Sequence, residues 1–297
     1  MINNVLKKSA MLAVVTLAFT TAQAATTTIS GGDVTAEIND AGTFNSSFDS
    51  TSPSPSGTPG LSYKGVEFVN IDVPSSWYWL SSSAFGSPFI AQYGSNPLGA
   101  STFGLGGSIA TTFNGSLSFL QTVSVTAPNQ LSVTVQLHNA GSSDITGVQW
   151  GVGFDPDQGG PGANITTNTI LGQGNAASVS AFDFLYGTGL GVTLANTTSA
   201  GAFQIAAYIN ELSCCDAVDP AIALAAGQAV GFTTFDDDSI SLAYNIGTLH
   251  ANQSATFGYS YTFAGPIPEP EIYAMMAAGL GLMGFVAGRR KQQLAAA

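Results

Sequence analysis

Alternation of apolar and polar side chains is the feature of this sequence that most narrows its fold. Over residues 131–138, Leu, Val, Val and Leu alternate with Ser, Thr, Gln and His. A repeat of two residues is that of a β-strand with one buried side and one solvent-facing side. Residues 117–125 alternate in the same way, and a short segment at 127–130 separates the two runs, which predicts a β-hairpin.

The same alternation recurs at residues 147–154, 240–246 and 257–263, so strands are expected along most of the chain. Between residues 25 and 265, only the Ala-rich segment 217–226 favours a helix. Residues 52–60 are rich in Ser, Pro and Gly, and we interpret them as a long loop. The sequence therefore predicts a mainly β fold, with one antiparallel β-sandwich domain over residues 25–265.

Charged residues are scarce. Asp, Glu, Lys and Arg make up 8% of the 297 residues, against about 25% in an ordinary soluble domain. Residues 25–265 contain 16 acidic residues and a single basic one, Lys64. Because few basic side chains are available to neutralise phosphates, nucleic-acid binding is excluded as a function. An acidic surface of this kind attracts divalent cations instead.

The N-terminus has the three parts of a secretory signal peptide. Lys7 and Lys8 precede the short apolar segment 11–19, and small residues at Ala22 and Ala24 follow it. This pattern predicts a signal peptide over residues 1–24, which the export machinery recognises and signal peptidase cleaves before Ala25.

The C-terminus has the features of a second targeting signal, made of three consecutive parts. Pro268, Glu269 and Pro270 precede the apolar segment 272–288, and Arg289, Arg290 and Lys291 follow it. A helix over 272–288 would span about 26 Å, which can cross a slightly thinned bilayer. The basic triplet predicts that residues 292–297 are cytoplasmic and that the outer domain lies outside.

This tail resembles the PEP-CTERM sorting signal over residues 266–291. The matching residues are Pro268, Glu269, Pro270, Tyr273, Ala274, the 279–282 Gly-Leu repeat, Gly284, Phe285, Arg289 and Arg290. Glu271 departs from many such tails, which have a small or hydroxyl residue after the motif. The resemblance implies a Gram-negative exopolysaccharide producer. It also implies export through the inner membrane, a C-terminal transmembrane helix, and processing by an exosortase to a cell-surface or secreted protein.

Asp155 and Asp157 are the candidate metal ligands. They follow a predicted strand and precede a Gly-rich segment, with Asn164 nearby. Oxygen ligands two residues apart on a loop suit calcium, but Asp and Pro are also ordinary turn residues. The Asp run at 236–238 is a second metal candidate, because a cation would relieve the repulsion among its carboxylates, but a solvated loop relieves that repulsion too. No cofactor other than calcium is expected.

Trp77 and Trp79 are candidate ligand-stacking residues. On a strand they share one face, with Tyr78 on the other, and flat aromatic rings suit the apolar faces of sugars. Burial in the core is the alternative, because large apolar side chains pack there most often. An exposed pair would indicate a carbohydrate-binding module.

The only cysteines are the neighbours Cys214 and Cys215. In an exported protein we expect oxidation, and adjacent thiols react with each other faster than with a partner. The sequence therefore predicts a vicinal disulfide within the turn 213–216. Free thiols and a bridge between two molecules are the alternatives.

The sequence contains no nucleophile elbow, HExxH motif or P-loop, so we expect no enzyme activity. The function predicted is a noncatalytic structural or adhesive protein of an exopolysaccharide or biofilm matrix, with exopolysaccharide as a candidate partner. A carbohydrate-binding module is the first alternative. A hydrolase acting on exopolysaccharide is the second, because its two carboxylates have no fixed spacing in sequence.

Overall fold

The structure is a computed structural model that describes residues 27–39, 41–44, 60–69, 75–92, 108–113, 116–158, 164–185 and 188–265. The predicted signal peptide, the sorting tail with its helix at about 272–288, and most of the 52–60 loop lie outside these residues. Within the described ranges, no helix is both long enough and apolar enough to cross a membrane.

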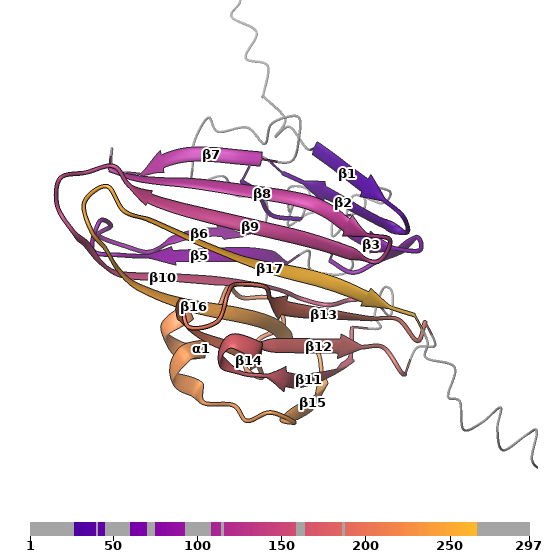
Figure 1. Cartoon of the computed structure of the whole chain (residues 1–297). Coiled ribbons are helices and arrows are strands. Elements are labelled where there is room, and N and C mark those ends of the chain that lie inside the picture. Colours follow the sequence, from indigo (N-terminus) through magenta and orange to yellow (C-terminus); the bar gives the residue numbers. More distant parts are fainter. Residues whose placement is uncertain are drawn as a thin grey trace, which may run out of the picture.

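The larger sheet has eight strands (Figure 1). In spatial order they are β15 (Thr233–Asp236), β11 (Thr166–Gly172), β12 (Ser178–Phe182), β13 (Gly191–Asn196), β17 (Ser254–Ala264), β9 (Gln130–Asn139), β8 (Leu117–Ala127) and β7 (Ser108–Phe113).

A five-stranded sheet has the order β14 (Gln204–Asn210), β16 (Ser239–Leu249), β10 (Ile145–Phe154), β5 (Ser76–Ser81) and β6 (Phe89–Gln92). A small sheet is formed by β1 (Thr27–Gly31), β2 (Val34–Ile38), β3 (Leu61–Tyr63) and β4 (Val66–Glu67). The helical elements described are η1 (Gly174–Ala176) and α1 (Pro220–Ala226). Every strand pairing in the described ranges is antiparallel, so the mainly β, antiparallel prediction is confirmed.

The predicted hairpin is formed by β8 and β9. Phe119 pairs with Leu137 and Val123 with Val133, and all four side chains are buried. The later pair behaves differently. β16 belongs to the five-stranded sheet and β17 to the eight-stranded sheet, so the chain changes sheets at residues 250–253.

The inward faces of the sheets share one core. At its centre the Trp150 ring stacks on Tyr78, with ring centroids 4.8 Å apart and planes 9° apart. Phe119 of β8 and Phe257 of β17 also contact the Trp150 ring, at 5.5 and 5.7 Å. These contacts join the five-stranded and eight-stranded sheets, which lie as layers in Figure 1.

The prediction that Trp77 and Trp79 form an exposed ligand-stacking pair is wrong. Both lie on the outer face of the five-stranded sheet, but that face is covered at Trp77. Trp77 is only 2% exposed and packs in a cluster with Tyr208, Val218, Ala223 of α1 and Ala243. Its indole lies over two glycines of β10. A Cβ at Gly153 would lie 2.4 Å from the ring and collide with it, and a Cβ at Gly151 would contact it at 3.5 Å. Trp79 is partly buried, so the two rings form no exposed platform.

Helix α1 has local signals that explain its short length. Asp219 caps its N-terminus, with the carboxylate accepting a 2.8 Å hydrogen bond from the Ala221 amide. Pro220 occupies the first turn, where its missing N–H costs little, and Gly227 ends the helix in the left-handed conformation at φ 63°. The helix packs on β14 and β16 and covers Trp77.

Candidate metal site beside a vicinal disulfide

The segment after β10 is held firmly in the interior. The amide of Asp155 donates a hydrogen bond to the Ser75 carbonyl, and the amide of Asp157 donates one to the Phe68 carbonyl, both at 2.9 Å. The two aspartates are 2% and 0% exposed. The sequence predicts them at a strand end, as observed, and the structure adds that both residues are buried. The Gly-rich residues 159–163 lie outside the described ranges.

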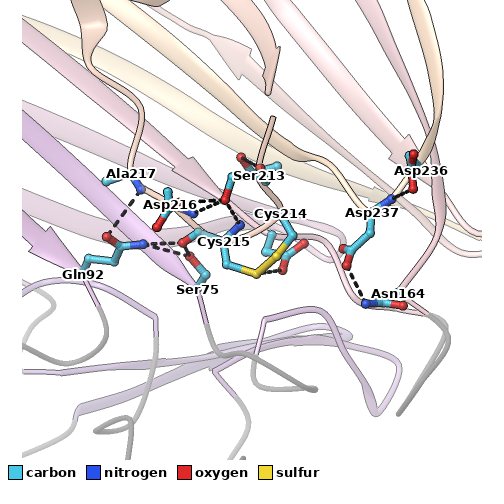
Figure 2. The surroundings of a disulfide bond; sticks show 12 residues. Ser75, Gln92, Asn164, Ser213, Cys214, Cys215, Asp216, Ala217, Asp236 and Asp237 are labelled. Carbon is cyan, nitrogen blue, oxygen red and sulfur yellow. Dashed lines mark hydrogen bonds between the residues drawn. A yellow bond between two sulfur atoms is a disulfide. The ribbon is translucent and has the colours of Figure 1, made fainter. Parts of the chain in front are cut away.

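Asp237 comes to the same place from the turn between β15 and β16. Carboxylate oxygens of Asp155, Asp157 and Asp237 all lie within 4.8 Å of one another. Asn164 reaches this group too, because its side-chain amide donates a 2.6 Å hydrogen bond to Asp237 (Figure 2). The two metal candidates of the sequence therefore form one acidic site, made of Asp155, Asp157 and Asp237.

The neighbouring aspartates do not join the acidic site. Asp236 is exposed, and its carboxylate accepts a 3.0 Å hydrogen bond from the Asp237 amide, which fixes the turn. Asp238 is buried, and this burial raises the pKa of its carboxyl. Only the middle residue of the run thus contributes to the group.

The geometry of the acidic site suits calcium. Calcium binds oxygen ligands at about 2.3–2.6 Å, so two oxygens that share one ion lie at most roughly 5 Å apart. The three carboxylates meet that limit. Each buried carboxylate also raises the energy of the others when all are ionised, and a divalent cation offsets this repulsion. Calcium at Asp155 and Asp157 stays a prediction, now with Asp237 as a third ligand.

A vicinal disulfide forms one wall of this site. Cys214 and Cys215 are joined, with Cα atoms 3.7 Å apart, in the segment between β14 and α1. The Cys215 sulfur lies 3.3 Å from a carboxylate oxygen of Asp155. Because a bonded sulfur carries no proton, this is a van der Waals contact rather than a hydrogen bond donated by a thiol.

The turn that contains the disulfide is tied to the five-stranded sheet. The Ser213 hydroxyl accepts hydrogen bonds from the amides of Cys215 and Asp216, both at 3.2 Å. The Cys215 carbonyl accepts hydrogen bonds from the side chains of Ser75 and Gln92, which lie beside it in Figure 2. A bridge between neighbours closes no long loop and so adds little chain-entropy stabilisation. Its role here is local: it shapes the turn beside Asp155.

We expect calcium to raise the melting temperature of the protein and a chelator to lower it. At a calcium concentration of 100 times Kd, binding adds about 2.7 kcal/mol of stability, or roughly 5–10 °C for a domain of this size. Asp157→Asn combined with Asp237→Asn should abolish the shift. Asp33→Asn, at an exposed turn, is the matched control and should retain it. An identical melting temperature in calcium and in chelator would show that the prediction is wrong.

Comparison with known proteins identifies the tail. Residues 266–291 match the PEP-CTERM protein-sorting motif, which confirms the resemblance drawn from Pro268, Glu269, Pro270 and the basic end. The motif implies an exported protein that is held at the membrane by its C-terminus before an exosortase processes it. No curated protein sequence matches the chain.

Solved structures are similar only at a low level. A polysaccharide lyase shares 12% identity at a TM-score of 0.39, over 69% of this chain and 30% of that one. A protein described as an aldose 1-epimerase, from Escherichia coli K12, shares 12% identity at a TM-score of 0.42, over 81% and 99%. A mutant heparan sulfate lyase from Pedobacter heparinus shares 8% identity at a TM-score of 0.31, over 77% and 28%. Similarity at this level carries no information about activity.

Proposed function

We propose that this protein is a noncatalytic structural or adhesive protein that an exosortase delivers to the cell surface or the extracellular matrix. The observation that carries the proposal is the PEP-CTERM motif at residues 266–291. The signal-peptide pattern at residues 1–24 supports it, because both ends then describe one route through the inner membrane.

The two histidines support a noncatalytic role. His250 lies 2.9 Å from Asp144, but the side chains are 69% and 52% exposed, so water solvates both. His138 pairs with the Ser254 hydroxyl at 2.9 Å on the outer face of the sheet. A catalytic acid or base is usually shielded from bulk water by the walls of its site, and the His250–Asp144 pair is not shielded.

The intact mass of the released protein tests the sorting route. We expect a product that lacks residues 1–24 and everything beyond the Pro-Glu-Pro region. Replacing Pro268, Glu269 and Pro270 together with alanine should abolish release and leave a cell-bound chain that keeps its tail. Glu271→Ala changes the one position that departs from the usual pattern, and release should continue. A released product that still contains Arg289–Lys291 would refute exosortase processing.

A further inference from the structure

Where β8, β9 and β17 form it, the outer face of the eight-stranded sheet is polar without being charged. β8, β9 and β17 contain no Asp, Glu, Lys or Arg, and their outward positions are mainly Ser, Thr and Gln. Hydroxyls from neighbouring strands stand side by side on this face, since Thr122 pairs with Thr134, and Ser124 with Ser132. Such a surface offers many hydrogen bonds and no ion pair.

A pocket of about 270 Å³ opens on this face. Its hydroxyl side chains come from Thr134 of β9, Thr256 of β17 and the segment after β13, which supplies Thr197, Thr198 and Ser199. The pocket is therefore built from three parts of the chain that are far apart in sequence.

Gly258 holds that segment close to the sheet. Its carbonyl accepts a 2.9 Å hydrogen bond from the Thr197 amide, and its own amide donates a 3.0 Å bond to the Thr198 hydroxyl. A Cβ at Gly258 would lie 2.7 Å from the Thr197 hydroxyl oxygen and 3.1 Å from the Val133 carbonyl oxygen, so a side chain here would push the Thr197 side chain away. The glycine thus allows the Thr197–Ser199 segment to form one wall of the pocket.

Most of the pocket hydroxyls are available to a ligand. Thr134, Thr197, Ser199 and Thr256 are exposed. Among the described residues, the hydroxyls of Thr134, Thr197 and Ser199 make no side-chain hydrogen bond. The Thr256 hydroxyl accepts only a long one, at 3.5 Å from Gln136. Each such hydroxyl can donate one hydrogen bond and accept others, so it can pair with another hydroxyl in either sense.

The charge of the molecule restricts the class of ligand. No charged side chain lines the pocket, and the chain carries a net charge of −12, so an anionic ligand would gain no ion pair and would be repelled. The volume lies just below the roughly 300–1,000 Å³ of pockets that hold drug-sized molecules, which suits a single ring. We propose that this pocket binds one sugar residue of a neutral polysaccharide.

The pocket involves residues 134–258 and not the sorting tail, so the two proposals fail independently. We would test binding by native gel electrophoresis of the exported, processed protein through gels that contain dextran or hydroxyethyl cellulose. Polygalacturonate serves as the anionic comparison. At least one neutral polymer should retard the protein, and polygalacturonate should not.

The variants distinguish the loss of pocket hydroxyls from a loss of folded protein. Thr134→Val with Thr256→Val removes two hydroxyls but keeps β-branched side chains, and should weaken retardation about tenfold. Thr134→Ser with Thr256→Ser keeps the hydroxyls and should preserve it, as should the off-pocket control Ser124→Val with Thr126→Val. Unchanged melting temperatures would show that each variant is folded. Retardation by no neutral polymer, equal retardation of the Val variant and the parent, or stronger retardation by polygalacturonate would each overturn the proposal.

Discussion

Gly153→Ala should destabilise the protein by about 3 kcal/mol, at the upper end of the usual cost of overpacking, and lower its melting temperature by roughly 6–12 °C. A Cβ at this position would lie 2.4 Å from the Trp77 ring and 2.6 Å from the Ile240 carbonyl oxygen. The second contact is to backbone of the neighbouring strand, which cannot move aside without disturbing the β10–β16 pairing. Relief by rotation of Trp77 alone is therefore insufficient.

Gly86→Ala is the matched control for this change. No atom lies within 4 Å of a Cβ at Gly86, so the same substitution should leave the melting temperature nearly unchanged. Both variants would be followed by circular dichroism during thermal unfolding. If Gly153→Ala melted with the parent protein, the close packing of Trp77 on β10 would be disproved.

The same packing explains why the sequence could not settle the role of Trp77. Alternation correctly puts Trp77 and Trp79 on one face of β5 and Tyr78 on the other, and the structure places Tyr78 in the main core. Whether the face of Trp77 and Trp79 is exposed to solvent depends on helix α1, which packs over Trp77. This helix follows β5 by well over one hundred residues. Gly151 and Gly153 are present in the sequence, but that they make room for the Trp77 ring follows only from the pairing of β5 with β10.

The order of the strands in the five-stranded sheet also determines which aspartates meet in the acidic site. The alternation up to Phe154 predicts that Asp155 and Asp157 follow a strand end, and they do. Asp237 joins them because β10 and β16 are antiparallel neighbours, with Phe154 paired to Ile240. The end of one strand then lies beside the start of the other. No pattern in a single sequence specifies that β10 pairs with β16, so the run at 236–238 could only be a separate candidate.

The disulfide could be predicted because it depends on adjacency alone. Cys214 and Cys215 need no tertiary contact to meet, and oxidation follows from export. Its surroundings could not be predicted. Ser75 and Gln92, which hold the Cys215 carbonyl, come from β5 and β6 regions more than one hundred residues earlier and had no distinguishing pattern. Contacts of this kind become visible only once the sheet is assembled.

Trp150→Ala should have the largest effect on stability of any single change considered, about 3–5 kcal/mol, or roughly 6–20 °C in melting temperature. Trp150 is fully buried and contacts aromatic rings from both large sheets, so alanine would leave a cavity where the layers meet. Trp79→Ala, at a partly exposed site, is the control and should cost clearly less.

A second variant distinguishes the ring from its polar atom. The indole N–H of Trp150 is buried and makes no hydrogen bond among the described residues, so its loss should cost nothing. Trp150→Phe keeps most of the aromatic surface and should therefore be milder than Trp150→Ala. Guanidinium unfolding followed by circular dichroism would rank the three variants. An alanine variant as stable as Trp79→Ala would refute the central role of this ring. Because the sorting motif at residues 266–291 follows β17 in the sequence and does not include Trp150, a destabilised Trp150→Ala chain should still lose its tail. It should, however, reach the surface in smaller amounts, since unfolded chains are degraded during export.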